Sequence, residues 1–181
     1  MTLYIHAFTA TRRAASDPSH RWKSPDLHIV EQAVEDDAIC VAGYVTMCDA
    51  IKSDVSAGAG IRKVLAILAM LRADRLHHIG WNGDGWIIHL TPHEIWFEGV
   101  HGQDLPPLDI ATGGSVSLDQ FELALRTYQA FLDDPTQTPR CVPLPPPLDR
   151  ASLPPRPLEE DDYDEVYPAI EAYQKQHGLW P

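Results

Sequence analysis

Histidines are the residues in this sequence with the clearest potential for chemistry, because imidazole is a common ligand of divalent metals. Five of the nine lie within one stretch: His77, His78, His89, His93 and His101. His89 and His93 are four residues apart, but Pro92 and a strand-like pattern keep them off a common helix face, unlike the pair of a zinc-binding helix. The side chains of His77 and His78 would point to opposite faces of a strand. We therefore expect ordinary histidines, no metal site and no cofactor, with a histidine–metal enzyme as the alternative.

The other candidates for catalysis lack the neighbours that their chemistry needs. Cys40, Cys48 and Cys141 are an odd number without metal-like spacing, which is typical of reduced thiols in a cytoplasm. No basic or helix-start context lowers the pKa of Cys40 or Cys48 in the pattern, so we interpret both as core thiols. Residues 56–60 are glycine-rich but lack the Gly-Lys-Ser/Thr of a phosphate loop, and there is no Gly-x-Ser-x-Gly element. The sequence thus predicts a protein that is not an enzyme.

Acidic side chains are concentrated near the C-terminus. The run contains Glu159, Glu160, Asp161, Asp162, Asp164 and Glu165, with Tyr163 and Tyr167 beside them. A solvated linker is the simpler interpretation, and a docking strip for a basic partner, with the tyrosines as anchors, is the alternative. The chain has 26 acidic and 14 basic side chains and a formal net charge of −12. Such a charge disfavours nucleic acid and membranes as partners and favours cationic proteins.

A β-hairpin is the best-defined element in the pattern. Trp86–Leu90 and residues 94–98 are rich in β-branched and aromatic residues, and Thr-Pro-His between them supplies a turn. Alternation puts Ile88 and Leu90 on a core face, whereas the opposite face carries His89, Trp96 and Glu98. Trp96 would pack against a neighbouring element if covered and would be a binding hot spot if exposed. We therefore include Trp96 and Glu98 among the candidate partner-binding residues.

Helical periodicity predicts two helices that cover this hairpin. Residues 61–75 are apolar on most sides, which indicates a central helix. Residues 117–133 carry an apolar stripe, and Ser117 and Gln120 form a capping box at the start.

Weaker patterns predict the remaining elements. We expect a strand over residues 2–9, an exposed loop over 10–24, a helix from Pro25 to Val34, and a helix rather than a strand over 37–53. Leu105, Leu108 and Ile110 are possible edge-strand residues. The proline-dense segment 139–157 excludes helix and central strand and favours polyproline II. Pro168 is expected to start a last helix that Gly178 ends.

Together these elements predict an α+β fold, with an antiparallel sheet packed by helices in one domain over residues 1–135. Residues 136–181 would form a proline-rich strap, the acidic run and a short C-terminal helix that docks on the domain through Ile170, Tyr173 and Trp180. No apolar run is long enough to cross a bilayer, and the first residues lack a signal-peptide pattern. A cytoplasmic location is expected.

Residues 81–133 resemble the immunity proteins of bacterial polymorphic-toxin and contact-dependent inhibition systems. The resemblance rests on Trp86-Ile87-Ile88-His89-Leu90, on Glu94-Ile95-Trp96-Phe97 and on the capped helix with Leu118, Phe121 and Tyr128. It implies a small, cytoplasmic, non-enzymatic protein that occludes or distorts the active site of a toxin.

We therefore expect the protein to neutralise a cognate bacterial toxin, such as a nuclease or nucleotide-handling effector with a basic active-site cleft. The acidic run would occupy that cleft, with Trp96, Tyr163 and Tyr167 as anchors. An adaptor that presents its polyproline segment to aromatic grooves is a second alternative.

Overall fold

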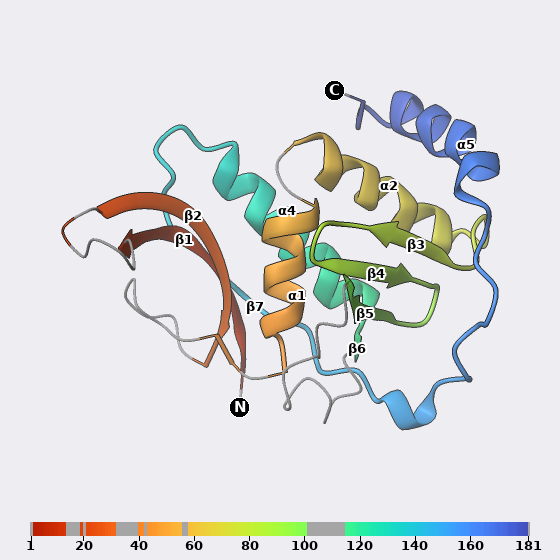
Figure 1. The fold of residues 1–181 in the computed structure, drawn as a ribbon, viewed down its shortest axis with the longest axis horizontal. Coiled ribbons are helices and arrows are strands. Elements are labelled where there is room, and N and C mark those ends of the chain that lie inside the picture. Colours follow the sequence, from red (N-terminus) through yellow and green to blue (C-terminus); the bar gives the residue numbers. More distant parts are fainter. Residues whose placement is uncertain are drawn as a thin grey trace.

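The computed structural model describes residues 2–13, 19, 21–31, 40–41, 43–55, 58–100 and 115–180. Within these residues it contains two antiparallel sheets and four α-helices that share one hydrophobic core (Figure 1). The predicted α+β class is confirmed. None of the helices in this part of the chain is long and apolar enough to cross a membrane.

The four-stranded sheet is built on the predicted hairpin. Its strands, in spatial order, are β3 (Ile79–Asn82), β4 (Trp86–Leu90), β5 (Ile95–Gly99) and β6 (Ser115–Val116). Thr91 closes the β4–β5 turn, since its backbone N–H and its hydroxyl both donate to the carbonyl of Glu94. Ile88 and Leu90 are fully buried on the core face, as the alternation predicts. The possible edge-strand residues Leu105, Leu108 and Ile110 lie outside the described residues.

A carboxylate from outside the sheet fixes the β3–β4 turn. Asp54, in the short π-helix η1 (Ile51–Val55), accepts backbone hydrogen bonds of 2.9, 3.1 and 2.9 Å from Asp84, Gly85 and Trp86. A Cβ atom at Gly83 would lie 2.2 Å from the Cβ of Asp54. Residue 83 therefore has to be glycine for the carboxylate to reach these three amides.

The structure contains a second sheet of three strands, of which the sequence predicts only the N-terminal strand. This sheet consists of β2 (Arg21–Val30), β1 (Tyr4–Arg13) and β7 (Arg140–Pro143), in that order. The expected N-terminal strand is confirmed.

Two predictions for the N-terminal region are wrong where the structure describes it. The helix expected from Pro25 to Val34 is strand up to Val30, and both ends of the loop expected over 10–24 belong to β1 and β2. The reason is that the apolar residues Leu27 and Ile29 alternate with the polar residues Asp26 and His28, which is the two-residue period of a strand. Pro25 is tolerated because β2 is an edge strand, where a missing N–H costs little.

The helices predicted over residues 37–53, 61–75 and 117–133 are largely confirmed. The segment expected to be helical over 37–53 is helical from Val45 onward, as α1 (Val45–Ala50) continuing into η1, whereas Cys40 and Val41 lie before the helix. The central helix is α2 (Ala59–Arg72) and the capped helix is α4 (Leu118–Leu132). The capping box forms as expected, with Ser117 and Gln120 exchanging side chain–backbone hydrogen bonds of 3.1 Å.

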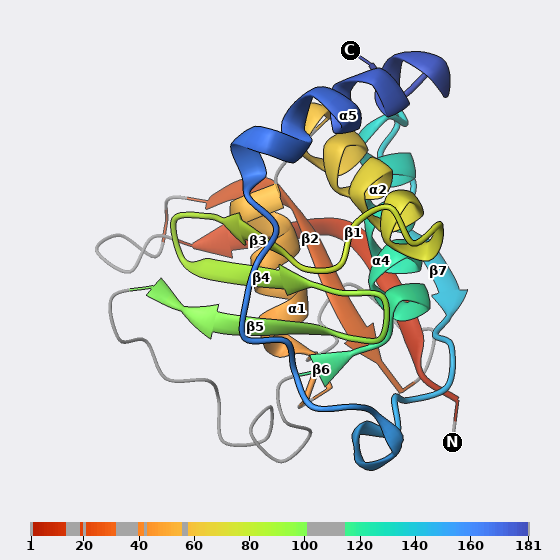
Figure 2. The same ribbon diagram turned by 90° about the vertical axis from the view of Figure 1, so that its right-hand side faces the viewer.

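The two sheets and the helices pack around a common core. Both views of the ribbon show α1 between the two sheets (Figures 1 and 2). Phe97 of β5 and Phe121 of α4 are in ring contact, with centroids 6.1 Å apart. Arg72 at the end of α2 forms ion pairs with Asp119 and Glu122 on α4, one of them at 2.6 Å.

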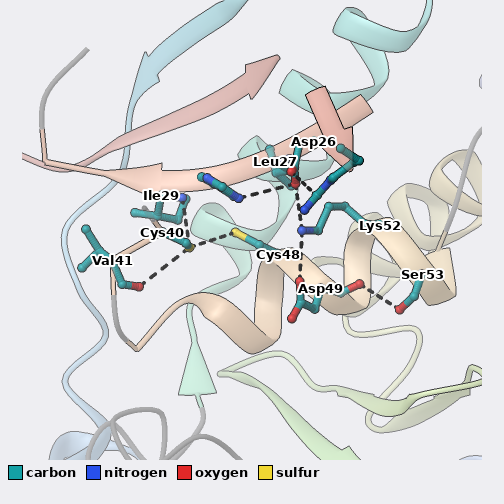
Figure 3. A network of polar contacts seen from close by, with 11 residues as sticks. Asp26, Leu27, Ile29, Cys40, Val41, Cys48, Asp49, Lys52 and Ser53 are labelled. Atoms are coloured by element: carbon teal, nitrogen blue, oxygen red, sulfur yellow. Dashed lines mark hydrogen bonds and ion pairs between the residues drawn. The ribbon is translucent and has the colours of Figure 1, made fainter. Parts of the chain in front are cut away.

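A buried carboxylate links β2 to η1, the π-helix that continues α1 (Figure 3). Asp26 is 1% exposed and accepts hydrogen bonds from Lys52 Nζ at 2.9 Å, from the backbone of Leu27 at 2.9 Å and from the guanidinium of Arg12. Burial raises the pKa of this carboxyl, but the hydrogen bond and charge of Lys52 outweigh burial and leave the pKa below its usual value.

The same region contains two neighbouring thiols (Figure 3). The sulfurs of Cys40 and Cys48 are 3.8 Å apart. Their hydrogen bond, helped by the backbone N–H of Ile29, lowers the pKa of the Cys40 thiol, and the same contact and burial raise the pKa of Cys48. The sequence shows only that a basic or helix-start context is missing for these thiols, whereas the main cause of the lowered pKa of Cys40 is the neighbouring thiol.

The chain after residue 135 adds a strand, a connection and a helix. After β7 on the edge of the three-stranded sheet come residues 144–162, called here the C-terminal arm, which include a 3-10 turn (Arg150–Ser152). The helix α5 (Tyr163–Gln176) begins well before Pro168, not at it as predicted, because Asp162 caps the helix and Asp164 and Glu165 lie in its first turn.

The helix α5 packs against α2. Ile170 is fully buried and Tyr173 packs against the core, whereas Trp180 is 42% exposed, beneath Lys175. Gly178 follows the helix with a φ of +67°, which confirms its expected role.

Candidate functional site

The C-terminal arm crosses the face of the four-stranded sheet that points away from the core (Figure 2). It contacts the strands one after another. The guanidinium carbon of Arg156 lies 4.7 Å from the ring centroid of Trp96 on β5, and Glu160 Oε1 lies 3.2 Å from His89 Nδ1 on β4. Beside β3, the Asp161 carboxylate accepts the backbone N–H groups of His77 and His78 at 2.7 and 3.1 Å. The mixed face predicted for the hairpin is thus covered by the acidic run itself.

Two of the five histidines named above come together beneath the arm. His78 Nε2 and His89 Nδ1 are 3.1 Å apart, and the two side chains are almost fully buried. The other nitrogen of His78 donates to the carbonyl of Glu159 at 3.0 Å, and the other nitrogen of His89 donates to the carboxylate of Glu98 at 3.2 Å. Of the other three, His77 and His93 are exposed, and His101 lies outside the described residues.

Glu160 completes this cluster, and a glycine makes room for it. Its Oε1 lies 3.2 Å from His89 Nδ1 and 3.8 Å from His78 Nε2. Gly80 is the strand partner of His89, and a Cβ atom at Gly80 would lie 2.5 Å from Glu160 Oε2. The carboxylate therefore occupies the space of the missing side chain.

Trp96 packs against the histidine cluster. Its ring stacks on His89, with centroids 4.8 Å apart and an interplanar angle of 10°, and Arg156 covers it from the arm. The sequence allowed either a covered or an exposed Trp96. Only 9% of Trp96 is exposed, so it is covered. Glu98, by contrast, is exposed beside His89.

A buried carboxylate holds the middle of the arm in place. Glu94 is 2% exposed and accepts hydrogen bonds from Ser115 Oγ at 2.6 Å and Arg156 Nε at 3.3 Å, with Arg150 Nε at 3.1 Å. Beside it lies an open cavity of 260 Å³ lined by His77, His93, Pro155 and their neighbours. The arginines of the arm thus neutralise a charge that the sheet buries.

The rest of the acidic run faces outward. Glu159, Asp162, Asp164 and Glu165 are exposed, and no Lys or Arg among the described residues forms an ion pair with any of them. Leu158, at the start of the run, is 100% exposed. Together with Leu158 these four residues are called here the acidic ridge.

The two tyrosines accompany the acidic ridge, with Tyr163 between Asp162 and Asp164 and Tyr167 two residues after Glu165. Tyr163 and Tyr167 are half-buried with ring centroids 5.7 Å apart, and Lys63 Nζ lies 4.7 Å from the ring of Tyr167. Burial and the charge of Asp164 raise the pKa of Tyr163, so its hydroxyl stays neutral.

Several residues of this region escaped the sequence analysis. Arg150 and Arg156 lie in a proline-dense segment that carries no periodic signal, and their partner Glu94 is some sixty residues away. Gly80 is one of several glycines with no turn context. Leu158 did carry a signal, as a lone large apolar residue between prolines and carboxylates.

Comparisons of this chain with known proteins identify no related family. No family model matches the chain, and neither a curated protein sequence nor a solved structure gives a significant match.

Proposed function

We propose that this protein is an immunity protein that neutralises a cognate bacterial toxin by docking on a basic surface at the toxin's active site. The observation that carries the proposal is the acidic ridge, which combines four carboxylates that have no cationic partner among the described residues with a fully exposed leucine. The resemblance of residues 81–133 to immunity proteins of polymorphic-toxin systems agrees with this function.

The ridge is suited to binding because it is held in place before a partner arrives. Asp161 forms three backbone-linked hydrogen bonds with His77 and His78, of 2.7, 3.1 and 2.8 Å, and Asp162 caps α5. A surface that is already ordered loses less conformational entropy on association. Its negative charge would attract a basic cleft over long range, as an anionic substrate would.

Leu158 replaces Trp96 as the expected anchor. Exposed ion pairs contribute only about 0–1 kcal/mol each, so slow dissociation needs apolar contacts at the centre of the interface. Trp96 is unsuited to this task while Arg156 and the arm cover it. Leu158, with the exposed edges of Tyr163 and Tyr167, remains available beside the carboxylates.

The polyproline adaptor receives less support. Gln120 Nε2 donates to the carbonyls of Pro145 and Pro146 at 3.1 Å each, so this part of the arm is bound to α4. A polyproline ligand for an aromatic groove would need to be free on its outer side and to adapt to the groove.

Co-expression with a candidate toxin domain taken from a neighbouring reading frame tests the proposal. The ridge variant is Glu159→Gln, Asp162→Asn, Asp164→Asn and Glu165→Gln. The control variant is Asp74→Asn, Asp84→Asn, Asp133→Asn and Asp149→Asn, which removes the same charge from exposed positions elsewhere. We expect the native chain and the control variant to protect growth and to co-purify with the toxin, and the ridge variant to do neither.

Protection by the ridge variant equal to that of the native chain would show that the interface lies elsewhere. A native chain that neither protects nor binds would contradict the immunity function itself.

A further inference from the structure

We propose that His78, His89 and Glu160 form a binding site for one Zn²⁺ ion. One ligand atom from each of the three residues lies within 4.8 Å of the other two. They come from three separate places in the chain: His78 directly precedes β3, His89 lies in β4 and Glu160 lies in the C-terminal arm.

The hydrogen bonds of the two histidines direct their free lone pairs at each other. The carbonyl of Glu159 and the carboxylate of Glu98 can only accept, so His78 Nδ1 and His89 Nε2 must carry the protons. In neutral imidazoles this leaves His78 Nε2 and His89 Nδ1 as acceptors, facing each other at 3.1 Å with Glu160 Oε1 beside them. Three acceptors without a donor repel one another, and a cation between them removes the repulsion.

The spacing of these atoms fits a tetrahedral zinc ion. Ligands at about 2.05 Å from the metal in a tetrahedral site are about 3.3 Å from one another. The three distances between ligand atoms here are 3.1, 3.2 and 3.8 Å. Two imidazoles and one carboxylate are a donor set that zinc accepts, with water as the fourth ligand on the side where Glu160 is exposed.

The surroundings have further features of a metal site. A hydrogen bond from each ligating histidine to a carbonyl or carboxylate fixes the ring and increases its basicity. Trp96 stacks on His89 and shields it from solvent. Gly80 leaves the space in which the Glu160 carboxylate lies.

A bound ion would fasten the C-terminal arm to the sheet, because Glu160 belongs to the arm and both histidines to the sheet region. The inference is independent of the proposed function, since metal binding is measured on the isolated chain.

Calorimetric titration of the chelator-treated protein with Zn²⁺ at pH 7.5 tests the site. We expect one ion per chain, a higher melting temperature with Zn²⁺, and a tetrahedral visible spectrum when Co²⁺ is used instead. His89→Gln and Glu160→Gln should each weaken Zn²⁺ binding by more than the roughly 10–100-fold typical of changes outside the ligand set. Glu98→Ala, which removes only the partner of His89, should fall within that range.

Two controls match the ligand variants in chemistry and position. His77→Gln and Glu159→Gln change the same residue types next to the site, and we expect Zn²⁺ binding to be unchanged. Gly80→Ala should push the Glu160 carboxylate away and weaken binding as Glu160→Gln does, whereas Gly85→Ala, whose Cβ would meet only ordinary contacts at 3.6 and 3.9 Å, should not.

The alternative to a metal ion is a proton between His78 Nε2 and His89 Nδ1, so that one doubly protonated imidazole donates a hydrogen bond to the other. A native protein that binds Zn²⁺ no more tightly than His89→Gln or Glu160→Gln would overturn the metal site in favour of that proton. If His77→Gln and Glu159→Gln weakened Zn²⁺ binding as much as the ligand variants do, the proposed site would be overturned in favour of nonspecific binding of Zn²⁺ to the surface. Glu160→Gln keeps the test decisive if a histidine variant fails to fold, because the Glu160 side chain is 45% exposed.

Discussion

Asp26 is the clearest case of a buried charge that the fold depends on. Its carboxylate is 1% exposed, and its partners Lys52 and Arg12 are 20% and 47% exposed. Removing the charge leaves these cations without their main partner, and their partial exposure reduces the penalty below that of a fully buried pair.

We expect Asp26→Asn to lower the free energy of unfolding by about 2 kcal/mol at pH 7. The pKa of Asp26 is lowered in the folded protein, since Lys52 outweighs burial, so its ionised form stabilises the fold above the unfolded-state pKa of about 3.9. This contribution is lost as the pH falls through the lowered pKa. Urea unfolding from pH 7 to pH 3 should therefore show the difference from the native protein shrinking below pH 4.

Asp49→Asn is the matched control for Asp26. Asp49 pairs with the same lysine at 3.0 Å but is 51% exposed, so its replacement should cost less than about 0.5 kcal/mol. Equal effects of the two variants at every pH would contradict the role given to Asp26.

Helices and strands that are determined by residues close together in the chain can be predicted from the sequence. The β4–β5 hairpin follows from alternation and a proline turn, and the capping box of α4 follows from Ser117 and Gln120. The strand β2 could not be predicted because Pro25 resembles a helix start, and only the position of β2 at the edge of a sheet shows why the proline is tolerated.

The candidate site could not be predicted in the same way. The contact of His78 with Glu160 joins residues some eighty positions apart, and the proline-dense arm has no periodicity that would show which face it covers. The sequence did indicate that His89, Trp96 and Glu98 share a face, but not that the acidic run lies on it.

The β3–β4 turn offers a test at the scale of elements. We expect Gly83→Ala to destabilise the protein by about 1–3 kcal/mol, because its Cβ would meet the Cβ of Asp54 at 2.2 Å and displace the acceptor of three amides. Thermal unfolding of Gly83→Ala and Gly85→Ala side by side measures this. A Gly83→Ala protein as stable as Gly85→Ala would contradict the role of Asp54 in the turn.

At the scale of the whole molecule, the chain after residue 135 has two kinds of surface. Its inner side contributes Leu144 and Ile170 to the core and Arg150 and Arg156 to the buried Glu94. Its outer side is the acidic ridge. Stability and partner binding should therefore respond to different residues of the same segment.

Ile170→Ala and Leu158→Ala separate these two roles. Ile170 is fully buried, so its truncation should cost about 2–4 kcal/mol in urea unfolding. Leu158 is fully exposed, so its truncation should change stability by less than about 0.5 kcal/mol. If Ile170→Ala left stability unchanged, α5 would not be docked as described.

Whether the acidic ridge docks on a basic toxin surface is tested most directly by the association rate, measured by stopped flow at increasing salt. We expect a rate for the native chain near ~10⁸ M⁻¹s⁻¹ at low salt that falls steeply as salt rises. The ridge variant should associate about tenfold more slowly with little salt dependence, the control variant should behave like the native chain, and Leu158→Ala should mainly raise the dissociation rate. A fast rate that is indifferent to salt, or equal rates for the ridge and control variants, would contradict the claim.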